Sequence, residues 1–372
     1  MAELTILMPV YNSISRNGGG FLQQALNSLL AQTFTDFEIH ILDNQSIDGT
    51  AKICKQYALK DNRIKFSIDT KKRFPEGGIN KLADTVTTKY LMIACCDDLW
   101  NHYCIEELIK ILKSNPTVDM VYPNGTFVDI HNHIGSPLLP KIAFDYTSSM
   151  EQNFCLNIQF RNVVPLVFGI FKSEAYINAL PFIPFDKLKA NVDNLFLAKF
   201  FLNGCKAKIY DRELFYYRNR KRDLIINAVE DMPNNPILIW IYYINHQLKF
   251  YKMVAKDIPN NKPLLNLVAI DSCIRCIGPL LSWIIKDLTN DAFERNILNT
   301  IHEKYEILRN LLLTTSYPQL TPELYEDTYR KMEILKTRIL EHILNIVTED
   351  KLILETIGNL NGIKENLQLK SN

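Results

Sequence analysis

Two adjacent aspartates, Asp97 and Asp98, follow an apolar run and could hold a divalent cation. They lie in ACCDDLW, residues 94–100, directly after the strand-like sequence YLMI. Carboxylate oxygens are the ligands that hard cations such as Mg²⁺ prefer, and such a cation absorbs negative charge on a departing phosphate. Cys95 and Cys96 precede the aspartates, so a thiol site is a second interpretation. Capping of the following helix by both aspartates is a third.

Other polar side chains follow strand-like runs in the same way. Tyr11 and Asn12 come after LTILMPV, Asp43 ends FEIHILD, and Asn44 follows it. The carboxyl ends of parallel strands meet at one edge of a sheet, and ligands bind beyond that edge. The polar residues at these positions therefore predict a ligand site.

The elements that must position these residues alternate in type over the first 120 residues. Strand-like runs are separated by segments with helical spacing of apolar residues, and one strand–helix unit takes about 30 residues. The expected strands are 4–10, 37–43, 63–69, 90–95 and 118–124, and the expected helices are 18–32, 48–61, 77–88 and 103–115. This alternation predicts right-handed crossovers and an α/β fold with a mostly parallel central sheet.

The pattern changes after about residue 125. Gly and Pro become frequent up to about 225, where one clear helix, DNLFLAKFFLNG (193–204), interrupts β-like runs. From about 232 onward nearly every segment has the spacing of a long amphipathic helix. We therefore expect two domains, residues 1–230 and an all-helical domain over 231–372.

Composition narrows the class of protein. The chain has 372 residues, 47% of them apolar and 22% charged, and a net charge of +1, so no global field attracts nucleic acid or an anionic membrane. Eight cysteines are scattered along it, and MAELTILMPVYN lacks the basic start and long apolar core of a signal peptide. No apolar run reaches the ~18 residues of a membrane helix. We expect a cytoplasmic protein with reduced thiols.

Three other patterns favour ordinary explanations. CIRC at 273–276 is isolated in a helix-like apolar segment, which favours core cysteines over a zinc or redox site. His131 and His133 share one face of a strand without a third ligand nearby in sequence, which favours a polar hairpin. The glycines 18–20 lack the spacing of a phosphate-binding loop, so a flexible loop before a helix is expected.

Several motifs in a fixed order resemble the family 2 glycosyltransferases of the GT-A fold. The motifs are PVYN (9–12), LNSLLAQTFTDFEIHILDNQSIDGT (26–50), YLMIACCDDLW (90–100), FGIFKSEAY (168–176) and NVDNLFLAKFFLNG (191–204). The resemblance covers about residues 4–220. It implies an enzyme that moves a sugar from a nucleotide diphosphate to an acceptor hydroxyl, with inversion and with Mn²⁺ or Mg²⁺.

The resemblance also implies a donor site, residue by residue. The D-x-D motif of the family falls on Cys95, Cys96 and Asp97, so Asp97 is the implied metal ligand. Cys95 replaces the first aspartate and is interpreted as structural, because a thiolate suits Mg²⁺ poorly. Asp98 is expected to orient the loop or contact the sugar. The other implied donor-binding residues are Pro9, Tyr11, Asn12, Asp43 (for the base, usually uracil), Asn80 and Arg218.

Each of these roles has a plainer alternative. Asp43 could only shape the turn DNQSIDG, in which Asp48 is expected to shape the turn or cap a helix. Asp193 is implied as the general base that deprotonates the acceptor, with a simple N-cap as the alternative. Arg218 begins the basic part of YYRNRKRD (216–223) and is implied as a clamp on the diphosphate. A solvated loop or a patch facing anionic lipid is the alternative.

We therefore expect an inverting glycosyltransferase with a nucleotide-binding half (1–100), an acceptor half (101–230) and the helical domain. A UDP-sugar is the expected donor, a glycan, lipid-linked glycan or protein the acceptor, and nucleic acid is not an expected partner. Two roles stay open for 231–372, namely homo-oligomerisation and peripheral contact with the inner face of a membrane. The alternative function is a nucleotide-sugar-binding protein or a nucleotidyltransferase-like enzyme with a degenerate metal site, because the first motif aspartate is absent.

Overall fold

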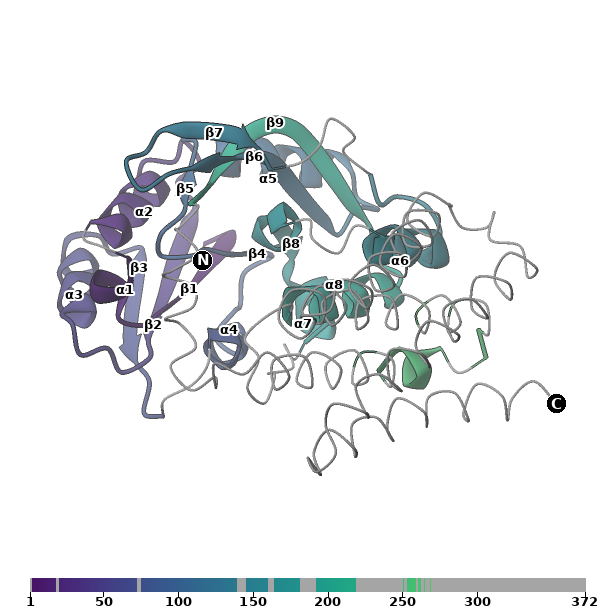
Figure 1. Cartoon of the computed structure of the whole chain (residues 1–372), viewed down its shortest axis with the longest axis horizontal. Coiled ribbons are helices and arrows are strands. Elements are labelled where there is room, and N and C mark those ends of the chain that lie inside the picture. The colour runs from purple at the N-terminus through teal and green to yellow at the C-terminus, as the bar shows by residue number, and fades with distance from the viewer. Residues whose placement is uncertain are drawn as a thin grey trace, which may run out of the picture. The chain divides into compact units, whose positions relative to one another are not determined.

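The chain divides into two compact units, Met1–Glu230 and Asp231–Asn372. A computed structural model (Figure 1) describes residues 2–17, 20–71, 75–138, 145–159, 164–180 and 192–218 of the first unit. In the second unit it describes residues 250, 253–258, 260–261, 264 and 268. The candidate site residues named above all belong to the first unit.

The first unit is built on one sheet of nine strands, in the order β3-β2-β1-β4-β8-β6-β9-β5, with β7 paired to β6. The strands are β1 Leu4–Val10, β2 Phe37–Asp43, β3 Ile64–Ile68, β4 Tyr90–Ile93, β5 Leu99–Trp100, β6 Met120–Val128, β7 Ile134–Pro137, β8 Ile170–Lys172 and β9 Ala207–Arg218. Five of them lie where strands were expected from the sequence, over residues 4–128.

Most of the sheet runs in one direction. β1 pairs in parallel with β2 and β4, β2 with β3, and β6 with β9. β8 pairs antiparallel with both β4 and β6, and β5 and β7 also run against their neighbours. The predicted α/β class with a mostly parallel sheet is confirmed in this mixed form. One difference from expectation is β8, a three-residue strand between β4 and β6 that has no clear pattern of its own.

Helices connect these strands. They are α1 Ser13–Asn17, α2 Phe21–Leu30, α3 Thr50–Lys60, α4 Pro75–Ala83, α5 Cys104–Ser114, α6 Met150–Gln159, α7 Ser173–Asn178 and α8 Val192–Leu202, with a 3₁₀ turn, η1, at Val164–Phe168. α3 packs on β2 and β3, and α4 packs on β1 and β2. The parallel strands are therefore buried and their ends are held in place by the helices that follow them.

Burial of the central strands explains their composition. In β1 the side chains of Leu4, Ile6, Leu7 and Met8 are fully buried, as expected of a parallel strand covered on both faces. α2 buries one stripe of its surface, made of Phe21, Leu22, Ala25, Leu26 and Leu29. Apolar burial contributes roughly 25 cal/mol per Å², so this packing holds the strands in place. The residue at the end of each strand therefore has a fixed position at the sheet edge.

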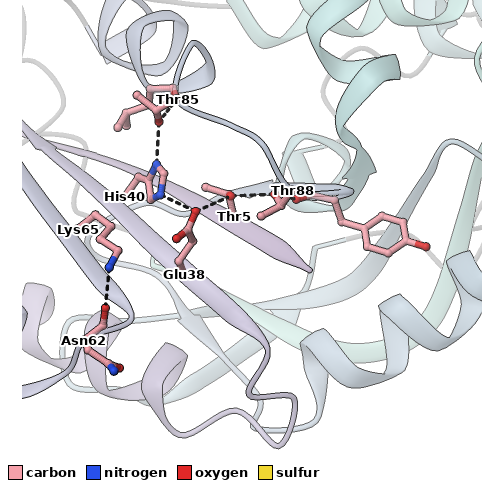
Figure 2. Close-up of polar contacts among 9 residues, drawn as sticks. Thr5, Glu38, His40, Asn62, Lys65, Thr85 and Thr88 are labelled. Atoms are coloured by element: carbon pink, nitrogen blue, oxygen red, sulfur yellow. Dashed lines mark hydrogen bonds and ion pairs between the residues drawn. The ribbon is translucent and has the colours of Figure 1, made fainter. Parts of the chain in front are cut away.

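A polar network ties the start of β4 to β1 and β2 (Figure 2). The hydroxyl groups of Thr5 and Thr88 lie 2.8 Å apart, and Thr88 donates to the Tyr90 carbonyl at 2.7 Å. On β2, His40 Nε2 lies 2.8 Å from the Glu38 carboxylate, and Nδ1 lies 2.7 Å from the Thr85 hydroxyl. These contacts anchor the loop that feeds β4, the strand that precedes Asp97.

In the second unit, residues 253–257 are helical, and Phe250, Val254, Leu264 and Val268 are buried. The rest of the predicted helical domain, with the CIRC motif and the roles in self-association or membrane contact, lies outside the described residues. Among the helices that the structure describes, none is both long and apolar enough to cross a membrane.

Candidate active site

The carboxyl ends of β1, β2 and β4 meet at one edge of the sheet, as the sequence predicted. Val10 pairs with Asp43, and the Asn44 N–H donates to the Val10 carbonyl at 2.9 Å. Beside them, the Ala94 N–H donates to the Leu7 carbonyl at 2.9 Å. The segments that follow β1, β2 and β4 are therefore neighbours. They carry the predicted donor-binding residues and the turn with Asp97.

The loop after β2 is folded around Asp43, which is 1% exposed. Its carboxylate accepts hydrogen bonds from the Ser46 N–H, at 3.0 Å, and from the Ser46 hydroxyl. Ser46 Oγ in turn accepts the Asn12 N–H at 2.8 Å, and Asn12 Oδ1 accepts the Ile47 N–H at 2.9 Å. Asp43 thus does shape a turn, and that turn also connects it to the end of β1.

Backbone conformation at this edge is unusual. Asn12 and Gln45 have φ angles of 45° and 61°, in the left-handed region that few residues other than glycine adopt. Asparagine tolerates this region best among them. Such strain persists where surrounding contacts impose it, and it concentrates at ligand sites, which is consistent with a ligand site at the ends of β1 and β2.

Asp48 organises the remainder of this loop. One carboxylate oxygen accepts the N–H groups of Ile14 and Ser15 at 3.0 and 2.8 Å, and the other accepts the Thr50 N–H and hydroxyl at 3.1 and 2.6 Å. Partial burial alone would raise the pKa of Asp48, but the hydrogen bonds from Ser15 and Thr50 outweigh it and lower the pKa to about 2. Of the two predicted roles for Asp48, shaping the turn is confirmed, while the N-cap position of α3 is occupied by Gly49.

One polar pair at the same edge was missed by sequence reasoning. Asp69 follows β3, its side chain is fully buried, and its Oδ1 lies 2.8 Å from Lys81 Nζ on α4. The Asp69 carbonyl accepts Gln45 Nε2 at 3.3 Å, and its N–H donates to the Asp43 carbonyl at 2.8 Å. The signal was present, since Asp69 ends RIKFSID just as Asp43 ends FEIHILD.

The turn after β4 brings three candidate metal ligands together. Asp97 and Asp98 are 3% and 2% exposed, and Cys95 is half-buried. One ligand atom from each of the three lies within 4.8 Å of the others. Two carboxylates fit a hard divalent cation, and the thiol adds a softer ligand. Cys95, interpreted as structural from sequence, is therefore placed with the carboxylates.

Capping of the next helix by these aspartates, the plainer alternative, is wrong. The strand β5 follows the turn, and α5 begins only at Cys104. Its N-cap residue is Tyr103, which makes no side-chain capping hydrogen bond. Instead, Arg218, at the end of β9, bonds to the Asp98 carboxylate and to the main-chain carbonyl of Asp97.

Arg218 is 2% exposed and contacts both aspartates. Its N–H donates to Asp98 Oδ1 at 2.9 Å, and its side-chain Nε donates to the Asp97 carbonyl at 2.7 Å. Its remaining guanidinium nitrogens donate to oxygens of other protein segments. The predicted clamp on the diphosphate is therefore not the role that this geometry favours. Arg220, Lys221 and Arg222 of the same cluster lie outside the described residues.

The other predicted residues occupy separate elements. Asp193 lies in the first turn of α8 and is half-buried. Asn80 lies on α4, whose Gly78 approaches Pro9 so closely that a Cβ there would sit 3.2 Å from Pro9 Cβ. Tyr11, half-buried, directly follows β1. Asp193 thus comes from a different part of the chain than the donor-site residues.

The histidines are explained by a hairpin. His131 and His133 are exposed in the turn between β6 and β7, where the Asp129 carboxylate accepts both of their N–H groups, at 2.7 and 2.9 Å. His133 Nδ1 lies 3.1 Å from the same carboxylate. Within the described residues they join no group of three metal ligands, and the predicted polar hairpin is confirmed.

Comparison with known proteins bears on this site. Residues 5–163 match the model of the family described as Glycosyl transferase family 2. The chain is 23% identical over 228 residues to an uncharacterized glycosyltransferase of Methanocaldococcus jannaschii, covering 61% of this chain and 74% of that protein. It is 22% identical over 262 residues to the Escherichia coli UDP-Glc:alpha-D-GlcNAc-diphosphoundecaprenol beta-1,3-glucosyltransferase WfgD, covering 70% and 98%.

Among solved structures, S. aureus TarS 1-349 in complex with UDP-GlcNAc matches with a TM-score of 0.56 and 17% identity, covering 91% of this chain and 92% of that one. The sheet and its helices thus define an α/β fold of the GT-A type. The glycosyl transferase family 2 match covers residues 5–163, and over these residues the chain has the sequence of a glycosyltransferase. The predicted family is confirmed, while the roles of individual residues stay predictions.

Proposed function

We propose that this enzyme transfers a sugar from a nucleotide-diphosphate donor, a UDP-sugar, to an acceptor hydroxyl with inversion, using Mn²⁺ or Mg²⁺. The observation that carries the proposal is the cluster of Cys95, Asp97 and Asp98 at the carboxyl edge of the sheet. Two similar proteins support the donor class, since WfgD is a UDP-Glc glucosyltransferase and TarS was solved with UDP-GlcNAc. The acceptor is a hydroxyl of a glycan, a lipid-linked glycan or a protein.

The donor base is proposed to bind between the ends of β1 and β2. The buried Asp43 carboxylate is the group we assign to the base, with Pro9, Tyr11 and Asn12 lining the pocket from β1. Asn80 on α4 extends the same pocket, because α4 packs on β1 and β2. Asp69 with Lys81 closes it beside Asp43, from the adjacent end of β3.

The diphosphate is proposed to lie against the turn after β4. Asp97 is the proposed metal ligand, and Asp98, whose carboxylate accepts the Arg218 N–H, orients the turn or contacts the sugar. A divalent cation bound there would neutralise charge on the diphosphate as it leaves. Cys95 offers a third ligand atom in place of the missing aspartate.

The proposed general base is Asp193. In the transfer, the acceptor oxygen bonds to the anomeric carbon while the bond from that carbon to the diphosphate oxygen breaks. The hydroxyl proton goes to the Asp193 carboxylate, and the electron pair of the broken bond leaves with the nucleoside diphosphate. Correct positioning of such a base contributes about 10²–10⁴-fold in rate. Position in the first turn of α8 gives the carboxylate a fixed backbone.

Binding and turnover test this proposal separately. Calorimetry with UDP should show tighter binding with Mn²⁺ than without it, and a panel of nucleotide sugars should identify a donor from which UDP is released. Asp193→Asn should lower turnover by about 10²–10⁴-fold and leave UDP binding unchanged. Binding of UDP without turnover of any donor, unaltered by Asp193→Asn, would instead favour a nucleotide-sugar-binding role with a degenerate metal site.

A further inference from the structure

The turn that carries Asp97 and Asp98 depends on one distant side chain. The bond from Arg218 Nε reaches the main-chain carbonyl of Asp97, and the Arg218 N–H reaches the Asp98 carboxylate. These partners are 121 and 120 residues apart in sequence. A shift of the guanidinium would therefore rotate the peptide of Asp97, while the main-chain bond to Asp98 would survive any substitution of the side chain.

The same guanidinium is anchored by the turn of the β6–β7 hairpin, residues 129–133. Arg218 Nη1 donates to the Asp129 carbonyl and to Asn132 Oδ1, both at 2.8 Å. Asn132 has a φ of 66°, and its N–H donates to the Asp129 carbonyl at 3.1 Å. Because Asn132 adopts the left-handed conformation, the turn presents two acceptor oxygens to the same nitrogen, Arg218 Nη1. The two N–H groups of that nitrogen have a rigid planar geometry, which two fixed acceptors can match.

Helix α2 supplies the remaining contacts. Arg218 Nη2 donates to Gln24 Oε1 at 3.0 Å, and the guanidinium carbon lies 4.1 Å from the centre of the Phe21 ring. The cation is therefore surrounded by acceptors and an aromatic face rather than by water. A buried charge with this many bonds is costly to disturb, because any bond that is lost leaves a desolvated group behind.

From this geometry we infer that Arg218 is a positioning residue for the metal-binding turn, and that the hairpin turn 129–133 is the anchor against which it holds Asp97 and Asp98. The catalytic consequence rests on the proposed function, whereas the mechanical linkage is a property of the protein alone. A plain packing role would leave the hairpin and the turn independent of each other. Under the inferred role, loss of the acceptor oxygen at the distant Asn132 should reduce the order of residues 95–100.

The first test uses matched substitutions at Asn132. Asn132→Gly removes the acceptor oxygen and keeps a residue that adopts positive φ without strain. Asn132→Asp restores an acceptor at the same position and also tolerates this backbone. Ile134→Thr, at an exposed position on β7, controls for a general disturbance of the hairpin. Arg218→Gln removes the cation, and Arg218→Lys keeps the charge without the fork.

Hydrogen exchange on the ligand-free protein measures directly whether the hairpin turn 129–133 and the turn at 95–100 are linked. Loss of one hydrogen bond corresponds to roughly a fivefold change in an opening equilibrium, and loss of several to a larger one. Asn132→Gly should raise amide exchange in residues 95–100 about fivefold, and Arg218→Gln about tenfold or more. Asn132→Asp and Ile134→Thr should stay within about twofold of the parent protein. Unchanged exchange at 95–100 in Asn132→Gly would overturn the inference, even if Arg218→Gln fails to fold.

Titration with Mn²⁺ in the presence of UDP measures the effect of this linkage on metal affinity. Asn132→Gly should raise the half-saturating Mn²⁺ concentration about fivefold, with rescue in Asn132→Asp, while UDP affinity without metal stays within about twofold. An equal loss of metal-free UDP affinity in Arg218→Gln and Arg218→Lys would show that Arg218 touches phosphate directly, against the inference. Failure of the parent protein to bind Mn²⁺ with UDP would contradict the proposed function. The hydrogen-exchange result would still show whether the hairpin turn and the turn at 95–100 are linked.

Discussion

The loop after β2 and the turn after β4 both end a parallel strand and both carry buried aspartates, yet different contacts hold them. In the loop, Asp43 bonds to Ser46 and Asp48 bonds to Thr50, two or three residues away. In the turn, Asp97 and Asp98 bond to Arg218, which arrives about 120 residues later along the chain. The loop combines such local bonds with bonds to Asn12, Ile14 and Ser15, 33 to 35 residues earlier, whereas the turn is tied to a strand about 120 residues later.

This difference has a thermodynamic meaning. Local hydrogen bonds close small loops, so they cost little chain entropy and can form early. The bonds from Arg218 to the turn after β4 can form only once β9 has paired with β5 and β6. We therefore expect changes in the loop to act mainly on base binding and stability, and changes at the turn to act on the metal step.

The largest expected effect is at the turn. Asp97→Ala should lower kcat/KM by about 1,000-fold, because charge stabilisation by a bound cation is worth several kcal/mol in the transition state. Calorimetry should show that Mn²⁺ no longer tightens UDP binding, while metal-free UDP binding is retained. Normal binding of donor and metal in this variant would mean that the two regions do not differ as described.

A smaller effect is expected at the loop, and it should not depend on metal. Asp43→Asn should weaken UDP binding by about 10- to 100-fold with and without Mn²⁺, since one charged hydrogen bond to the base is lost. Ser46→Ala is the matched control, because it removes the partner inside the loop and keeps the carboxylate. Equal losses in both variants would show that Asp43 acts only by shaping the turn.

Sequence reasoning succeeded where contacts are local or periodic. Short patterns predict most strands and helices of the first 120 residues, the strand-end positions of Asp43 and Asp97, and the turn shaped by Asp48. β8 was missed, because three residues between a 3₁₀ turn and a short helix carry no period. The position of Arg218 was also out of reach, because no local pattern indicates which distant carbonyl a guanidinium will meet.

Cys95 separates this chain from the motif that it resembles. Cys95→Asp should tighten Mg²⁺ binding in the presence of UDP by about tenfold, because a carboxylate suits Mg²⁺ and a thiolate does not. Cys95→Ser, which keeps a small polar side chain, serves as the control and should change Mg²⁺ affinity little. Parallel titrations with Mg²⁺ and Mn²⁺ measure the preference. An unchanged Mg²⁺ affinity in Cys95→Asp would place residue 95 outside the metal site despite its proximity to the carboxylates.

The smallest effect is expected at Asp48, within the locally held loop. Asp48→Asn should lower the free energy of unfolding by about 1 kcal/mol, since the carboxylate that accepts hydrogen bonds from Ile14, Ser15 and Thr50 is replaced by a weaker acceptor. The pKa of Asp48 is about 2 in the folded protein against an ordinary value of 3.8, so its contribution is complete above about pH 4 and is lost as the pH falls towards 2. Denaturant unfolding should therefore show a constant deficit for the variant between pH 5 and 8 that shrinks below about pH 4. A deficit that persists at about pH 2.5 without shrinking would mean that the Asp48 hydrogen bonds, and not its charge, carry the effect.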